Sequence, residues 1–109
     1  MITKRQILVF KSSADILYSS RDYTSATILY FKTLFAVKDF LLLEEIGESP
    51  KDHSARFKKL EKYFPQLFKE LDVELSTYRD TYSKIIDNDT CKRIKKLVEN
   101  DIKKYKIKE

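Results

Sequence analysis

Residues that favour tight turns are scarce in this chain, which has one glycine and two prolines among 109 residues. A β-sheet protein of this length needs many tight turns, and such turns draw on glycine, proline and Asn-Gly pairs. Apolar residues recur instead at intervals of three and four, the spacing that places side chains on one face of a helix. We therefore predict an all-α fold made of a few long helices with short connections.

The apolar periodicity predicts four long segments, the third of which is interrupted by a proline. A proline inside a helix removes a hydrogen bond and breaks or kinks the helix, so we expect a break at Pro65. Gly47 is expected to end the second helix as its C-cap. The predicted helices cover residues 4–19, 23–46, 53–64, 65–86 and 90–106.

The segment 23–46 is apolar around most of its circumference. One stripe includes Leu34 and Val37, and a second includes Phe31 and Phe35. A helix that is apolar nearly all round must be buried on several sides, and three short partners in so small a domain can hardly cover it. We therefore expect an uncovered patch that marks an interaction surface, most simply that of a two-fold homodimer formed through this helix.

Composition limits the remaining possibilities. The net charge of +5 fits contact with RNA through the lysine-rich C-terminal segment, although solvated helices rich in lysine have the same excess. Cys91 is the only cysteine, which excludes an intramolecular disulfide and favours a reducing cytoplasm. The longest apolar run, 40–43, is far shorter than the about 20 residues that cross a bilayer. We expect one domain over residues 1–109, soluble and cytoplasmic, without signal peptide or membrane segment.

The motifs of common enzyme classes are missing from the sequence. There is no glycine-rich phosphate loop, no His-Glu-x-x-His, no nucleophile elbow and no pair of cysteine or histidine ligands. We therefore expect neither a metal nor a cofactor. His53, the only histidine, lies at a predicted helix start, where a neutral imidazole could transfer protons. The alternative is that His53 caps the helix or packs against the loop before it.

A second candidate site lies near the end of the third segment. Tyr78 and Tyr82 are four residues apart and are expected to share one helix face, whereas Asp80 and Lys84 share another. By itself, the Asp80–Lys84 spacing is typical of an ordinary ion pair on a helix surface. Arg79, beside a polar residue and two phenols, could instead bind a phosphate with two nitrogens of its guanidinium group.

Three stretches of the chain together resemble the HEPN family (higher eukaryote and prokaryote nucleotide-binding domain), small helical proteins of archaea and bacteria. The stretch 22–32 is similar to the polar and aromatic residues that open the long second helix of the family. The stretch 47–54 is similar to its Gly…Pro-x-x-His loop, and Arg79-Asp80 lies where the family has an arginine followed by a polar residue. The likeness covers residues from about 7 to 105.

The resemblance implies an up-and-down bundle of four to five helices that dimerises. In nuclease members, an Arg-polar-x-x-x-His motif from each protomer meets at the dimer interface and cleaves RNA without a metal. Arg79 and Asp80 match the first two positions, but Lys84 takes the place of the histidine. A lysine stays protonated at neutral pH unless burial lowers its pKa strongly. His53 could replace the missing histidine only if the fold brings it close.

Other HEPN proteins are partners of minimal nucleotidyltransferases, and some of these pairs behave as toxin–antitoxin modules. The resemblance thus implies a non-catalytic partner whose inter-subunit cleft, lined by Arg79, Asp80, Tyr82 and His53, binds a nucleotide or an RNA phosphate. One alternative is a metal-independent ribonuclease that uses Arg79 with Lys84 or His53. The other is a purely structural adaptor, in which Arg79 has no special task.

Overall fold

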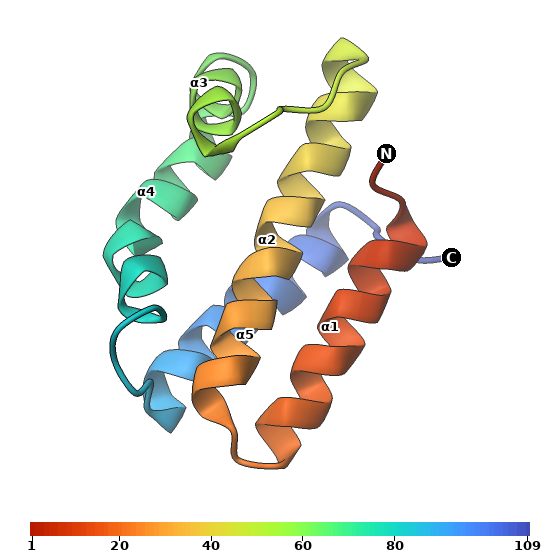
Figure 1. Cartoon of the computed structure of the whole chain (residues 1–109). Coiled ribbons are helices and arrows are strands. Elements are labelled where there is room, and N and C mark those ends of the chain that lie inside the picture. Colours follow the sequence, from red (N-terminus) through yellow and green to blue (C-terminus); the bar gives the residue numbers. More distant parts are fainter.

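The computed structural model describes all 109 residues, and five α-helices make up its regular structure (Figure 1). The helices are α1 (Lys4–Ser19), α2 (Tyr23–Ile46), α3 (His53–Tyr63), α4 (Pro65–Asp80) and α5 (Asn88–Lys104). No strand is present. The prediction of an all-α bundle of four to five helices is therefore confirmed.

Side-chain caps fix the start of four of the five helices. The side chains of Thr3, Asp22, Asp52 and Asp87 each accept a hydrogen bond from the amide of the third helical residue. Each of these bonds satisfies a backbone amide that has no partner inside its helix. The fifth helix, α4, begins with Pro65, which has no amide hydrogen to satisfy and is therefore well suited to a first turn.

Gly47 ends α2 in the left-handed backbone conformation, with a φ of 73°. Its amide donates a hydrogen bond to the carbonyl oxygen of Leu43 at 2.9 Å. Glycine adopts this conformation without the steric cost that a Cβ atom imposes. The predicted C-cap is thus confirmed, and the chain turns here toward α3.

Helix α2 lies at the centre of the bundle (Figure 1). Helices α1 and α5 pack along it, and the hairpin of α3 and α4 covers another side. All five helices contribute to one hydrophobic core of 19 buried residues, of which α2 supplies the largest share. Leu34, Val37 and Leu42 of α2 have no exposed surface at all.

The expectation that the bundle could not cover α2 is wrong. Within the single chain, the side chains of Phe31 and Phe35 are 1% and 9% exposed. Tyr78 of α4 packs edge-on against both rings, at centroid separations of 5.3 Å and 5.0 Å. Ile28 is the one large apolar side chain of α2 that is substantially exposed, at 44%. The burial of α2 therefore gives no reason to expect a homodimer through this helix, and the homodimer stays a prediction of the resemblance.

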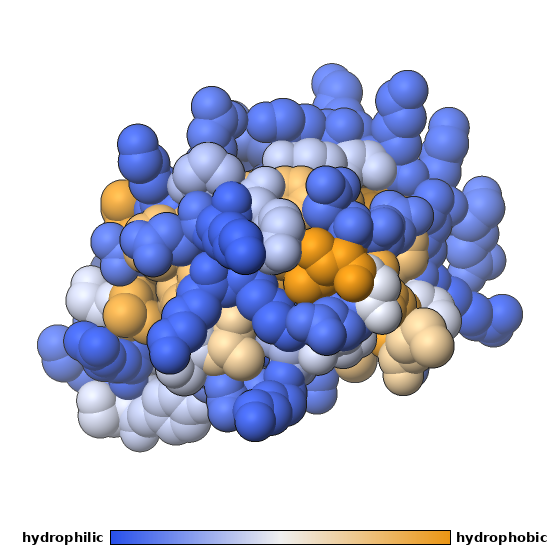
Figure 2. Space-filling view, turned by 90° about the horizontal axis from the view of Figure 1, so that it is seen from above, coloured by the Kyte–Doolittle hydropathy of each residue, from blue (hydrophilic) through white to orange (hydrophobic).

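Hydrophilic side chains dominate the end of the bundle where α3 lies. Figure 2 looks down on this end and shows apolar side chains only in small areas between hydrophilic ones. Isolated apolar side chains on a surface are normal in folded proteins. In the whole molecule, the large apolar side chains that are more than half exposed all lie outside α2. They are Met1, Val9, Ile16, Val73, Tyr82 and Ile85.

Helix α4 ends at Asp80 and not at the predicted Ile86. The hydroxyl of Thr81 donates a hydrogen bond to the carbonyl oxygen of Tyr78 at 2.6 Å, and the chain leaves the helix in a turn. The start of α5 also differs slightly, at Asn88 instead of residue 90. The apolar periodicity thus continued six residues further than the helix itself.

The loop after α4 is tied to the start of α2. The amide of Ile86 donates a hydrogen bond to Oγ1 of Thr24 at 2.9 Å, and the Ile86 side chain is buried. Tyr82 and Ile85, which lie within the predicted helix 65–86, are consequently outside α4, and their side chains are 76% and 95% exposed. One of these two, Tyr82, lines the candidate site described below.

A buried ionic cluster joins α2, α4 and α5. Lys38 of α2 has no exposed surface, and its Nζ atom donates to Oδ2 of Asp101 at 2.5 Å and to Oε1 of Glu70 at 2.8 Å. Burial is the main cause that raises the pKa of Glu70 to about 6. A buried charge is costly unless it is paired, so the cluster fixes α4 and α5 relative to α2.

No helix has the length and apolar character that crossing a bilayer requires.

Candidate functional site

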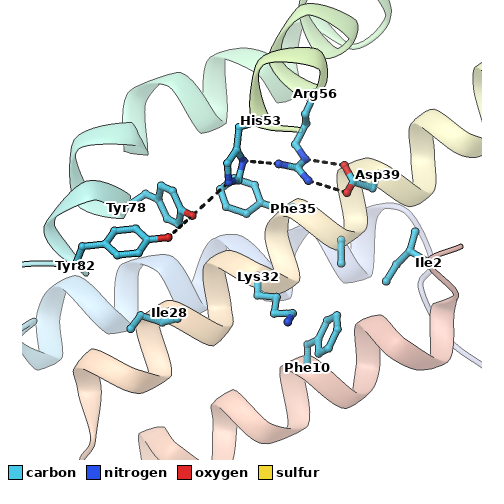
Figure 3. Close-up of a pocket in the computed structure, with 11 residues that line it drawn as sticks. Ile2, Phe10, Ile28, Lys32, Phe35, Asp39, His53, Arg56, Tyr78 and Tyr82 are labelled. Carbon is cyan, nitrogen blue, oxygen red and sulfur yellow. Dashed lines mark hydrogen bonds and ion pairs between the residues drawn. The ribbon is translucent and has the colours of Figure 1, made fainter. Parts of the chain in front are cut away.

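A groove with a volume of about 450 Å³ runs along one side of α2, between α1 and the α3–α4 hairpin (Figure 3). Small-molecule sites in proteins range from about 300 to about 1,000 Å³. We call this the α2 groove. Its lining combines aromatic rings with charged and polar side chains. Those used below are Phe10, Ile28, Lys32, Phe35, Asp39, His53, Arg56, Tyr78 and Tyr82.

The floor of the α2 groove is one face of α2. Ile28, Lys32, Phe35 and Asp39 follow one another at intervals of four, three and four residues, which places them along a single face of the helix. The wall on one side comes from α1, and the opposite wall from α3, α4 and the turn after α4 (Figure 3). The groove therefore depends on how the hairpin α3–α4 is attached to α2.

Arg56 of α3 binds Asp39 of α2 through two nitrogens of its guanidinium group. Its Nε lies 2.7 Å from Oδ1 and its Nη2 lies 2.9 Å from Oδ2. The two side chains are 11% and 19% exposed, so the pair is largely shielded from water. Two parallel charge-assisted hydrogen bonds hold α3 against α2 in a fixed orientation. They also engage both carboxylate oxygens of Asp39.

A third nitrogen of Arg56 determines the state of His53. Nη1 lies 2.5 Å from Nδ1 of His53. A guanidinium group can only donate, so Nδ1 must accept, and the neutral ring carries its proton on Nε2. Burial and the neighbouring Arg56 charge lower the pKa of His53 below its usual value, which keeps the ring neutral at pH 7.

Two phenol groups continue from His53 along the wall of the groove (Figure 3). Oη of Tyr78 lies 3.4 Å from Nε2 of His53 and 2.8 Å from Oη of Tyr82. Burial raises the pKa of Tyr78 to about 12, so its hydroxyl stays protonated. The ring of Tyr82 stands edge-on against that of Tyr78, with 5.5 Å between the centroids. A series of side-chain hydrogen bonds thus connects five residues, and we call this series the Asp39–Tyr82 chain. Its members are Asp39, Arg56, His53, Tyr78 and Tyr82.

Lys32 carries the uncompensated positive charge of the groove. It takes part in no ion pair of the structure. Its Nζ lies 4.8 Å from the ring centroid of Phe10 on α1, within the range of a cation–π contact. The charge of Arg56 is balanced by Asp39, whereas the charge of Lys32 remains available to a ligand.

The structure brings two of the predicted site residues into the groove and leaves three outside it. His53 and Tyr82 both line the α2 groove. Arg79 is exposed on α4 and is not among the lining residues. Asp80 binds Lys84, with 3.3 Å between Oδ1 and Nζ, as the ordinary ion pair that the spacing allowed. The predicted grouping of Arg79 and Asp80 with Tyr82 and His53 is therefore not formed within the chain.

The three charged residues of the groove, Lys32, Asp39 and Arg56, were not predicted from the sequence to belong to a site. The sequence did contain a signal for each. Arg56 follows His53 by three residues, so the two side chains share a helix face. Lys32 and Asp39 are charged residues within a largely apolar helix, and such residues need a specific partner or an opening to solvent.

Neither His53 nor Lys84, the two candidates from the sequence, is placed to act as a general base in the groove. The single lone pair of the neutral His53 ring, on Nδ1, already accepts a hydrogen bond from Arg56. Lys84 is 67% exposed and paired with Asp80 outside the groove. The structure contains no group of three or more His, Cys, Asp or Glu side chains arranged to hold a metal ion. What the groove offers is hydrogen-bond donors, a positive charge and aromatic rings.

Comparisons with protein-family models, with curated proteins and with solved structures found no match for this chain. The likeness to the HEPN family therefore stays a prediction based on the three stretches of sequence. The function has to be inferred from the residues of the α2 groove.

Proposed function

We propose that the α2 groove binds the phosphate-bearing end of a nucleotide or of an RNA strand, and that it does so without cleaving the ligand. The observation that supports this function best is that an unpaired cation, Lys32, and several aromatic rings line the same groove of about 450 Å³. Nucleotides combine an anion with a flat aromatic base. Proteins commonly hold them with a cation for the phosphate and a ring for the base.

The phosphate is expected at Lys32 and not at Arg79. Lys32 lies on the floor of the groove, where its ammonium group has no carboxylate partner. A bond between an ammonium group and a phosphate is charge-assisted and about twice as strong as a neutral one. Arg56 is less suited to this task because Asp39 already occupies two of its nitrogens.

The base is expected at Tyr82. This ring is 76% exposed, yet the hydroxyl bond and the edge-on contact with Tyr78 hold it in one orientation. An exposed phenol in a fixed orientation can contact a base, through either its ring face or its hydroxyl group, with little loss of side-chain entropy. Stacking on such a ring contributes about 1–3 kcal/mol per base.

Binding without cleavage follows from the state of His53. A ribonuclease without a metal needs a base that can take a proton from the 2′-hydroxyl group, and the lone pair of His53 is occupied by Arg56. In the setting that the HEPN resemblance implies, the protein would act as the non-catalytic partner of a minimal nucleotidyltransferase.

The decisive experiment is a calorimetric titration with UMP and with a short single-stranded RNA. We expect binding that weakens as salt rises from about 50 to about 200 mM, because a phosphate contact releases counterions. Lys32→Ala should reduce the affinity about tenfold, the value of one charge-assisted bond. Lys58→Ala, which removes an exposed lysine of α3 outside the α2 groove, is the matched control and should bind like the wild type.

Two results would contradict the proposal. One is the same affinity in the wild type and in Lys32→Ala, with thermal melting showing that both are folded. The other is cleavage of the RNA in EDTA by the wild type and not by His53→Ala. That second result would favour the ribonuclease alternative.

A further inference from the structure

The hydrogen bonds that lead from Arg56 to Tyr82 have a fixed donor-to-acceptor direction, because Asp39 fixes the orientation of Arg56. Both oxygens of this carboxylate accept from Arg56, at 2.7 Å and 2.9 Å, which fixes the plane of the guanidinium group. A third nitrogen then points at Nδ1 of His53 from 2.5 Å. Since a guanidinium group has no lone pair, this bond can run only from Arg56 to His53.

The direction is passed on through His53. With Nδ1 as the acceptor, the neutral ring has its only proton on Nε2. Nε2 lies 3.4 Å from Oη of Tyr78, so this contact has His53 as the donor and the phenol as the acceptor. His53 therefore acts as a positioning residue that transmits the polarity of Arg56 to the phenols.

The last link joins the two phenols. Oη of Tyr78 accepts from His53 and can give its own proton to Oη of Tyr82, which is 2.8 Å away. Hydrogen bonds that all run the same way polarise and strengthen one another, so this orientation is favoured over the reverse. Oη of Tyr82 is then an acceptor toward Tyr78, and its own proton has no partner within the protein.

The free polar groups of the α2 groove are consequently donors. Tyr82 offers a hydroxyl proton at one end of the groove, and Lys32 offers its ammonium protons on the floor (Figure 3). The carboxylate of Asp39 is already engaged by Arg56. A ligand that presents hydrogen-bond acceptors at both places is thus matched better than one that presents a donor at Tyr82.

We propose, on the basis of the function proposed above, that the Tyr82 hydroxyl selects bases with a carbonyl oxygen, such as uracil and guanine. The corresponding positions of cytosine and adenine carry an amino group, which is a donor and would face a second donor. UMP and CMP differ only at this position and at the adjacent ring nitrogen, which is protonated in uracil and not in cytosine. GMP and AMP differ there in the same sense, and GMP also carries a 2-amino group. These pairs therefore isolate the preference from phosphate binding.

The first test reads the direction of the chain without any ligand. His53 is the only histidine, so a long-range proton–nitrogen correlation spectrum contains one imidazole. We expect the neutral ring to be protonated on Nε2. A ring protonated on Nδ1 would overturn the proposal, because the hydrogen bonds could then not run toward Tyr82.

The second test measures the affinities of UMP, CMP, GMP and AMP by calorimetry. We expect UMP to bind about five to ten times more tightly than CMP, and GMP more tightly than AMP, as one neutral hydrogen bond implies. In Tyr82→Phe the difference should fall below about twofold. Tyr63→Phe, which removes a hydroxyl from a tyrosine outside the α2 groove, should keep the preference.

The possible failures separate the two proposals. If the nucleotides bind through Lys32 but UMP and CMP bind equally, the selection by Tyr82 is wrong and the nucleotide-binding function stands. If none of the four binds, both proposals fail. If Tyr82→Phe leaves the affinities of all four nucleotides unchanged, Tyr82 serves as a stacking ring only, and the proposed selection is also overturned.

Discussion

Nζ of Lys38 lies 2.5 Å from Oδ2 of Asp101, and the two side chains are 0% and 7% exposed. Removing one partner of such a pair leaves the other as a buried, unpaired charge, which costs about 3–5 kcal/mol. We therefore expect Lys38→Met to lower the free energy of unfolding, measured in urea, by about 3 kcal/mol.

Two further variants test the reason for that loss. Lys38→Met with Asp101→Leu removes both charges of this pair and leaves only the more exposed Glu70 carboxylate unpaired, so we expect the double variant to regain part of the lost stability. Lys95→Met is the matched control, because it breaks the more exposed pair with Glu99 and should cost less than about 1 kcal/mol. Equal losses in Lys38→Met and Lys95→Met would show that burial of the pair does not matter.

Glu70 should make the stability depend on pH between about 4.5 and 6. Its folded-state pKa of about 6 lies above the ordinary value of 4.5, mainly because of burial, so folding favours the protonated form. The resulting stabilisation is fully present below pH 4.5 and is lost as the pH rises through about 6, with a span of about 2 kcal/mol. Urea unfolding across this range should show the slope in the wild type, and Glu70→Gln should flatten it.

The imidazole of His53 should titrate below its usual pKa, because burial and the Arg56 charge both disfavour the protonated ring. The effect of His53 on the pH dependence of stability is opposite in sign to that of Glu70. A lowered folded-state pKa gives stability that is present at neutral pH and lost as the pH falls through that pKa. Proton NMR can follow the single imidazole directly. We expect the pKa to rise in Arg56→Leu, and an unchanged value would contradict the contact between these two side chains.

The helix boundaries could be predicted where a local signal marks them. Asp22 and Gly47 define α2 through a side-chain cap and a left-handed backbone, and both signals depend on neighbouring residues only. The end of α4 has no such local signal. Tyr82 and Ile85 continue the apolar spacing, but spacing does not reveal whether a partner exists to bury them.

The burial of α2 depends on packing that periodicity does not describe. The sequence shows that Phe31 and Phe35 need cover, and it does not show that Tyr78 supplies that cover from α4. A count of helices led to the expectation of a second chain. The aromatic contacts from α4, together with the packing of α1, α3 and α5 against α2, remove that need.

The candidate site was predictable only in its unusual residues. His53 and Tyr82 were recognised because a lone histidine at a helix start and a pair of spaced phenols stand out in a sequence. Arg79 was chosen for its neighbours along the chain, and it lies outside the groove. Arg56 was overlooked because one arginine among many surface charges looks ordinary until the fold places it opposite Asp39.

The α2 groove lies on the central helix, yet two of its residues are separate from the hydrophobic core. Ile28 and Lys32 face the groove from solvent-exposed positions, and substitutions at such positions usually change stability by less than about 0.5 kcal/mol. Phe35 and Ala36 belong to both the groove and the hydrophobic core. Substitutions at Ile28 and Lys32 can therefore change the surface of the groove without disturbing the interior that holds the bundle together.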